Sequence, residues 1–180
     1  MHVAVETDLR GRPAEEEHIP YYRQYIDQVP EGDILDIMAR QIGDTERYFL
    51  GFSAEEAVWR PAPDEWNAIE VAGHLADAER LFMHRALVIA RGDDTPWASF
   101  EPDLYVANGG FSERVIADVA AEFATVRAAS LAFLRGLGTE AWGRRAPESV
   151  SMRSVRAFAY TAAGHELHHL QSLKGQRSQE

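Results

Sequence analysis

Histidines in two distant segments have the spacing expected of metal ligands. His165 and His169 lie four residues apart in the stretch 164–170, late in an apolar pattern of helical spacing. Because residues four apart share one face of an α-helix, both imidazoles can point at one ion. His168 can pair with His165 at a spacing of three. Adjacent residues diverge by about 100° around a helix, however, so all three cannot easily share one ion.

His74 is the best candidate for a third ligand. It lies in another apolar helical pattern, much earlier in the chain. Three neutral imidazoles leave room for water or substrate, as in catalytic metal sites, and they suit Zn, Ni, Fe or Cu. Spacing alone equally allows a surface histidine pair that complements the dipole at the C-terminal end of a helix. Both interpretations are open at this level.

A glycine precedes two of these histidines, Gly73 before His74 and Gly164 before His165. Glycine in a helix interior costs about 1 kcal/mol relative to alanine. Its use therefore suggests that a backbone, an ion or a ligand approaches closely, with ordinary helix packing as the alternative.

Charged and aromatic residues near the histidines could either orient the ligating imidazoles or serve the fold alone. Side chains that could accept the second N–H of a ligating imidazole are Asp77, Glu79, Tyr160 and Glu166. Arg80 and Arg85 with Glu79 are predicted to form ion pairs along one helix. Trp59 and Trp66, near the start of the second helix, are predicted to be core residues or to form a hydrophobic staple.

Four helices are predicted to position the site. Apolar residues recur at helical spacing over about 32–51, 67–91 and 112–137, and from about 151 into the histidine-rich segment. Asn67 and Glu70 can form a capping box, Gly92 ends the second helix, and Ser112 is the expected cap of the third. With no strand-like alternation between them, these stretches predict an all-α four-helix bundle.

The remaining segments are predicted to be irregular. Closely spaced prolines and three tyrosines in 1–30 indicate an extended arm that wraps the body. The stretch 91–110 predicts a long crossover loop between helices two and three, which permits those helices to run parallel. Trp142 is the expected anchor of a loop over 138–150. The whole chain, 1–180, is interpreted as one domain with a core of about 32–172.

Composition excludes several classes of function. The 180 residues carry a net charge of −11, which disfavours binding to nucleic acid or to an anionic membrane surface. The sequence has neither a long uncharged apolar run nor the start of a signal peptide, so we expect a cytoplasmic protein. Zero cysteines exclude disulfides and thiolate ligands. Thiol chemistry would therefore need a small-molecule thiol.

Two signatures resemble those of the DinB-like superfamily of four-helix-bundle metalloproteins. The first is the stretch 66–80, which contains Gly73-His74-Leu75-Ala76-Asp77, followed by Arg85-Ala86-Leu87 and Arg91-Gly92-Asp93; the second is the stretch 163–170. The resemblance covers about 18–172. It implies a bundle in which the middle of the second helix faces the end of the fourth. It also implies the metal ligands His74, His165 and His169, with His168 outside the set.

The resemblance implies an activity as well. The superfamily includes thiol-dependent transferases and isomerases, so the expected function is transfer of a low-molecular-weight thiol such as bacillithiol, mycothiol or glutathione to a small electrophile. The expected cofactor is a divalent transition metal, Zn, Ni or Fe. One alternative is a hydrolase in which the metal activates water.

The other alternative is a non-enzymatic, stress-associated bundle in which the ion contributes only folding energy. That alternative predicts a closed site with a fourth protein ligand, His168 or Glu166. A homodimer formed through helix faces and an acidic monomer are both consistent with the composition.

Overall fold

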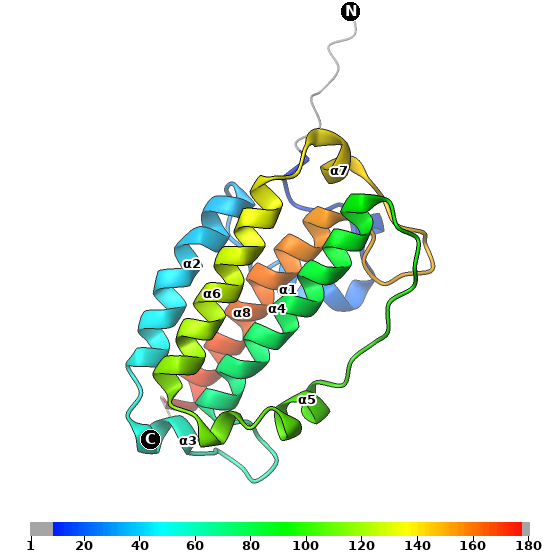
Figure 1. Cartoon of the computed structure of the whole chain (residues 1–180). Coiled ribbons are helices and arrows are strands. Elements are labelled where there is room, and N and C mark those ends of the chain that lie inside the picture. The colour runs from blue at the N-terminus through cyan, green and yellow to red at the C-terminus, as the bar shows by residue number, and fades with distance from the viewer. Residues whose placement is uncertain (1–8, 178–180) are drawn as a thin grey trace, which may run out of the picture.

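Four long helices form a bundle in the computed structural model, which describes residues 9–177 (Figure 1). They are α2 (Ile34–Leu50), α4 (Ala68–Arg91), α6 (Ile116–Arg135) and α8 (Val155–Arg177). Helices α4 and α6 run side by side in the same direction, antiparallel to α2 and α8 (Figure 1). Within 9–177 there is no β-strand, only two isolated bridges. The prediction of an all-α bundle with a parallel, crossover-connected pair is confirmed.

The ends of α2 and α4 follow from local chemistry. The Asp33 carboxylate accepts hydrogen bonds from the first backbone N–H groups of α2. Asn67 and Glu70 form the predicted capping box at the start of α4. Gly92 ends α4 with φ of 68°, a left-handed conformation that strongly favours glycine. Caps of this kind satisfy backbone groups that a helix terminus otherwise leaves unpaired.

The predicted start of the third helix was wrong. Ser112 lies in a short 3-10 helix, η3 (Phe111–Glu113), and α6 begins only at Ile116. The Ser112 hydroxyl donates to the Glu70 carboxylate at 3.2 Å and accepts from the Asn67 amide at 3.3 Å. This residue therefore braces the start of α4 instead of capping α6.

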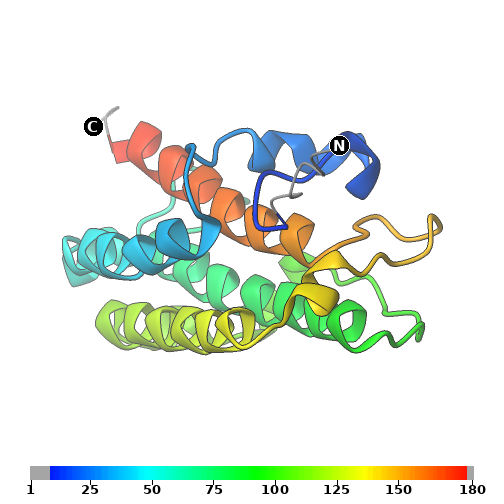
Figure 2. The same cartoon turned by 90° about the horizontal axis from the view of Figure 1, so that it is seen from above.

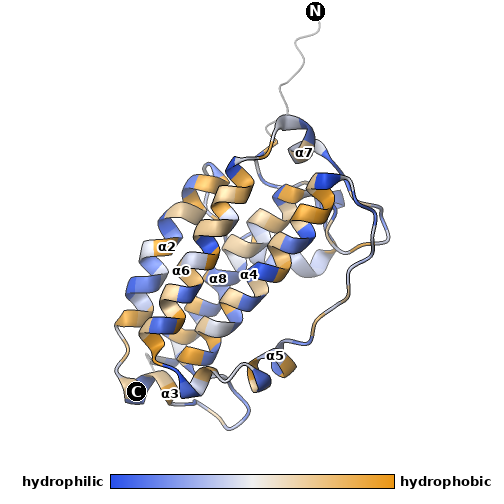
Figure 3. Cartoon of the chain, viewed as in Figure 1, coloured by the Kyte–Doolittle hydropathy of each residue, from blue (hydrophilic) through white to orange (hydrophobic). Residues whose placement is uncertain are grey.

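One buried arginine joins all four long helices. Arg127 on α6 has no exposed surface, and its Nε lies 2.7 Å from both carboxylate oxygens of Glu79 on α4. Its Nη1 donates to Gln41 of α2 at 2.8 Å and lies 2.8 Å from Glu166 of α8. The Thr45 hydroxyl of α2 also donates to Glu166. The buried hydrophobic residues form two clusters, and each long helix carries both hydrophobic and hydrophilic stretches (Figure 3).

The segments outside the bundle are more structured than predicted. The arm, described from residue 9 onward, contains η1 (Glu15–Glu17), η2 (Pro20–Tyr22) and α1 (Arg23–Ile26). It lies along α8, on the side away from α6 (Figure 2). The crossover contains α5 (Pro102–Asn108), and the loop before α8 contains α7 (Thr139–Gly143). The arm therefore does wrap the body, although residues 1–8 lie outside the described part.

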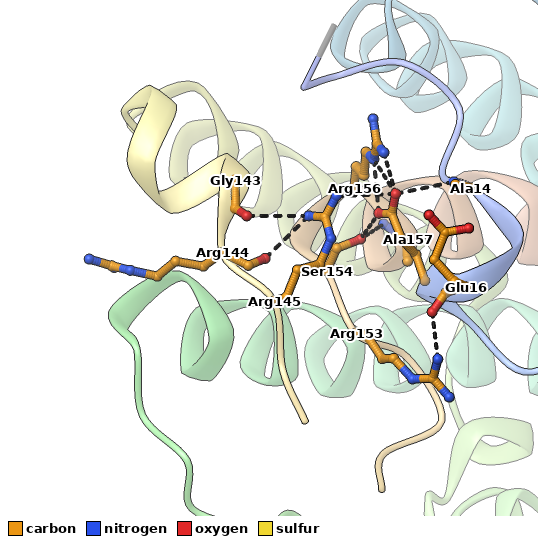
Figure 4. Close-up of polar contacts among 10 residues, drawn as sticks. Ala14, Glu16, Gly143, Arg144, Arg145, Arg153, Ser154, Arg156 and Ala157 are labelled. Carbon is orange, nitrogen blue, oxygen red and sulfur yellow. Dashed lines mark hydrogen bonds and ion pairs between the residues drawn. The ribbon is translucent and has the colours of Figure 1, made fainter. Parts of the chain in front are cut away.

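Polar contacts hold the arm against the loop that precedes α8. The buried Glu17 carboxylate accepts hydrogen bonds from Arg156 and Ser154, and the Arg145 guanidinium lies 3.2 Å away. Arg153 also donates to the carbonyl oxygen of Glu16 at 2.6 Å (Figure 4).

The short element α3 (Ala54–Val58) lies on the chain between α2 and α4. Among the helices of residues 9–177, none combines the length and the apolar character needed to cross a membrane.

Candidate metal centre

The three histidines predicted to be ligands lie together. The Nε2 atom of His165 is 3.1 Å from Nε2 of His74 and 3.1 Å from Nε2 of His169. One ring nitrogen from each residue lies within 4.8 Å of the other two. The fold explains this meeting, because α4 and α8 are antiparallel neighbours. The early part of α4 is thereby placed beside the later part of α8.

Burial keeps these imidazoles neutral. Burial lowers the pKa of His74 to about 4 and is also the largest cause that lowers the pKa of His169 to about 3. Burial likewise lowers the pKa of His165 well below its ordinary value, and the neighbouring imidazoles add to that effect. A histidine must be neutral to donate a lone pair to a metal. At neutral pH all three rings are therefore in the ligating form.

The donor set fits a divalent transition metal. Tetrahedral nitrogen ligands at about 2.0–2.1 Å from a zinc ion lie about 3.3–3.4 Å from one another. The observed separations of 3.1 Å need only a few tenths of an ångström of adjustment to reach that spacing. Nδ1 of His74 is buried with no hydrogen-bond partner among residues 9–177, so the polar contacts of this ring are made through Nε2. These three side chains could hold one ion.

Neither candidate for a fourth protein ligand joins the cluster in the described residues. Glu166 is directed to Thr45 and Arg127 inside the bundle. Nδ1 of His168 lies 3.4 Å from the Gln28 amide, outside the group that could hold a metal. A three-histidine arrangement leaves coordination positions for water or substrate, which is typical of catalytic sites.

The glycines beside the ligands make room for protein groups. A Cβ atom on Gly164 would lie 2.0 Å from the backbone carbonyl oxygen of Tyr25 in the arm. A Cβ atom on Gly73 would lie 2.4 Å from the ring of Phe111. The prediction of a close backbone approach is confirmed at Gly164, and at Gly73 the close neighbour is a side chain.

A cavity of about 770 Å³ opens above the histidines, and all three of them line it. Its aromatic walls come from separate parts of the chain: the arm supplies Tyr21, Tyr22 and Tyr25, the crossover supplies Trp97 and Phe100, and Trp66 precedes α4. Ligand pockets commonly have volumes of about 300–1,000 Å³ and mostly apolar walls. The cavity is thus large enough for a small-molecule substrate.

Sequence reasoning missed most of these walls. Trp66 packs against the core as predicted, but its ring also lines the cavity: its centroid lies 4.7 Å from that of His74, and it stacks on His169 at 6.1 Å. Trp59, also assigned to the core, is 47% exposed. Phe100 lies in the predicted crossover loop, for which no role in the site was predicted, but its ring stacks on His74 at 6.5 Å. The available signal was the density of aromatic residues in the arm and the crossover.

The predicted ion pairs along α4 were also partly wrong. Arg80 pairs with Asp77 at 3.0 Å instead of with Glu79, and Glu79 pairs with Arg127 of α6. Arg85 has no ion pair among the described residues and lines the cavity. The carboxylates of Asp77, Glu79 and Glu166, which were candidates to orient the imidazoles, contact arginines. Tyr160, the fourth such candidate, packs under the Arg12 guanidinium at 5.5 Å.

Comparison with known protein families identifies the family of this chain. A family model described as the DinB superfamily matches residues 37–173, which include the three histidines. The chain belongs to the DinB superfamily. A search of curated proteins returned no match.

A solved structure shares the fold of this chain. The protein is YfiT from Bacillus subtilis, described as a probable metal-dependent hydrolase with an unusual four-helix bundle topology. The TM-score is 0.68 at 12% identity, over 95% of this chain and 97% of YfiT. At this identity the likeness concerns the fold.

Proposed function

We propose that this protein is a metal-dependent enzyme that attacks a small electrophile with a nucleophile activated at the three-histidine site. The observation that carries the proposal is the meeting of the Nε2 atoms of His74, His165 and His169 at one cavity of about 770 Å³. A structural metal site is usually closed by four protein ligands, whereas this cluster has three and adjoins a substrate-sized space. That contrast favours an enzyme over a bundle in which the ion serves folding alone.

The chemistry required of the site is simple. A divalent metal held by three neutral imidazoles keeps its positive charge, and it would lower the pKa of a thiol or of water to supply a nucleophile at neutral pH. The protein's own contribution is to hold the imidazoles in their neutral form by burial. The aromatic walls exclude bulk water and orient an apolar electrophile beside the nucleophile.

The favoured nucleophile is a low-molecular-weight thiol, which makes the enzyme an S-transferase. In such a reaction the thiolate sulfur forms a bond to the electrophilic carbon, and the leaving group departs with its electron pair. A cavity of about 770 Å³ has room for a thiol of peptide size beside a small electrophile. The absence of cysteine means that the thiol would be supplied from solution.

A hydrolase is the second candidate. It is supported by the structural neighbour YfiT, which is described as a probable metal-dependent hydrolase. In this case water replaces the thiol at the same site. The aromatic walls would then bind the acyl or leaving group of a small ester or amide.

The first experiment measures metal content by elemental analysis of protein purified without an affinity tag. We expect about one equivalent of a divalent transition metal in the wild type and its loss in His74→Ala and in His169→Ala. The matched control is His168→Ala, which removes an adjacent imidazole from the same helix and should keep the metal. Metal retained in either ligand variant, or no metal in the wild type after reconstitution, would refute the site.

The second experiment separates the two nucleophiles. Metal-loaded protein is assayed with an aryl halide plus bacillithiol, mycothiol or glutathione, and in parallel with p-nitrophenyl esters and no thiol. Thiol-dependent product that disappears with a chelator and in His74→Ala supports the transferase. Ester cleavage with the same dependence supports the hydrolase. Activity that is insensitive to the chelator contradicts both.

A further inference from the structure

Arg85 is a buried cation without a carboxylate partner. Three arginines of the described chain are buried, and two of them are paired with carboxylates: Arg127 with Glu79, and Arg156 with Glu17. Arg85 is 6% exposed, yet no carboxylate in residues 9–177 lies within 4.0 Å of its guanidinium. Burying an unpaired charge is costly, so such a group calls for an explanation.

The neighbours of Arg85 leave much of its hydrogen-bonding capacity unused. A guanidinium offers five N–H donors. One nitrogen donates to the carbonyl oxygen of Ala98 in the crossover at 2.7 Å. The guanidinium carbon also lies 6.0 Å from the centroid of the Phe100 ring. These contacts fix the orientation of the side chain without neutralising its charge.

Arg85 belongs to the same cavity as the histidines. It lines the cavity, and it follows His74 on α4 by three helical turns, so that both residues project from nearly the same face. The Phe100 ring lies close to both residues: its centroid is 6.5 Å from that of the His74 ring, with the two rings stacked, and 6.0 Å from the Arg85 guanidinium carbon. A ligand lying across this ring would reach both the guanidinium and the space above the histidines.

We propose that Arg85 is a specificity residue that binds a carboxylate of the molecule reacting at the histidine site. This inference rests on the proposed function, because it places the anion on a reactant of the same cavity. The planar guanidinium matches a carboxylate through two parallel hydrogen bonds, which gives orientation as well as attraction. The aromatic walls accommodate an apolar body beside the charged group. The preferred ligand is therefore an aromatic or aliphatic carboxylic acid.

The other charged residues that line the cavity are acidic, so they cannot bind a carboxylate in place of Arg85. Asp93 and Asp94 also line the cavity, and Asp93 accepts hydrogen bonds from the backbone and the hydroxyl of Thr95. Their charges repel anions at the entrance. In the metal-free protein, binding of a carboxylate inside the cavity would thus depend on Arg85, which is the one arginine or lysine among the lining residues within 9–177.

The test is calorimetric titration with benzoate and with benzamide, its neutral analogue. Protein stripped of metal by a chelator is titrated first, so that benzoate cannot bind through an ion, and metal-loaded protein follows. We expect the stripped wild type to prefer benzoate over benzamide by at least tenfold, about 1.4 kcal/mol. The preference should vanish in Arg85→Gln and persist in part in Arg85→Lys. The charge-matched control is Arg91→Gln, an exposed arginine of the same helix, which should keep the preference.

Two results would overturn the inference: no preference for benzoate in the stripped wild type, or an unchanged preference in Arg85→Gln. Thermal unfolding of each variant checks that it is folded, and the wild-type comparison stands even if a variant is not. Because the stripped protein reports on Arg85 alone, failure here is distinct from failure of the metal site. The metal-loaded enzyme is then assayed with two pairs of compounds: a carboxylated electrophile and its neutral analogue, and a carboxylated thiol and its ester. The pair in which the carboxylate lowers KM identifies the reactant that Arg85 binds. The KM for that carboxylated reactant should rise at least tenfold in Arg85→Gln.

Discussion

Replacing Arg127 with methionine should destabilise the bundle by about 3–5 kcal/mol, the usual cost of removing one partner from a buried ion pair. Arg127 has no exposed surface, and it pairs with Glu79 and Glu166, which are 2% and 1% exposed. Methionine fills a similar volume but leaves two carboxylates facing each other in the core. The free energy of unfolding at pH 7.5 is measured by urea denaturation of metal-free protein.

The stability lost in Arg127→Met should also depend on pH. Burial already raises the pKa of Glu166 despite the neighbouring Arg127. Without Arg127, burial would raise the pKa of the Glu166 carboxyl group further above the value of about 4.3 in the unfolded chain. A group whose pKa is raised by folding favours the folded state as the pH falls. The destabilisation should therefore shrink by about 1–2 kcal/mol between pH 7.5 and pH 5.5.

Arg80→Met provides the matched control. Arg80 is 45% exposed and forms ion pairs with Asp77 and Glu122, so its loss should cost at most about 1 kcal/mol. Adding Glu79→Gln and Glu166→Gln to Arg127→Met should restore part of the stability by removing the unpaired charges. A cost below about 1 kcal/mol for Arg127→Met, or one that does not change with pH, would refute the reasoning.

Three further predictions concern the arm and the site. Gly164→Ala should lower the free energy of unfolding by about 1–3 kcal/mol and speed proteolysis in the arm, because its Cβ would lie 2.0 Å from a carbonyl oxygen there; unchanged proteolysis would contradict that contact. Burial opposes the ionisation of Glu17, but hydrogen bonds from Arg156 and Ser154 outweigh it and lower its pKa. Glu17 therefore adds stability above its unfolded-state pKa that is lost as the pH falls through the lowered value, so Glu17→Gln should flatten the acid side of a stability profile; an unchanged profile would argue against the pair. Copper or nickel should quench tryptophan fluorescence in wild type and much less in Trp66→Phe; equal quenching would place the ion elsewhere.

Local sequence signals predicted the bundle well where chemistry between neighbours decides the structure. The capping box at Asn67 and the glycine after Arg91 marked both ends of α4. The start of α6 was missed because the Ser112 hydroxyl serves α4, a partner far along the chain. A short-range pattern carries no information on such a contact.

In the candidate site, too, sequence spacing predicted contacts between residues close in the chain but not contacts between distant segments. The meeting of His165 and His169 follows from helical spacing, and the parallel crossover follows from loop length. The positions of Arg85 and Phe100 could not be predicted, because they depend on how the crossover folds back over α4. A pair between Arg85 and Glu79 was predicted, but the two residues are six apart on α4, which places them on different faces of the helix, and Glu79 is directed into the bundle toward Arg127.

The cavity has a floor and walls of different origin. Its histidines stand on α4 and α8, which are held in register by the bundle core, whereas most of its aromatic walls belong to the arm and the crossover. Substitutions at exposed wall positions of those outer segments, such as Tyr21, would leave the ligands undisturbed, since exposed loop positions tolerate change better than packed helices. Selection could therefore change what such a protein accepts without rebuilding what it does. For protein engineering, the positions to vary are the exposed wall residues of the arm and the crossover, and not the arm residues Glu17 and Ile26, which are buried against the bundle.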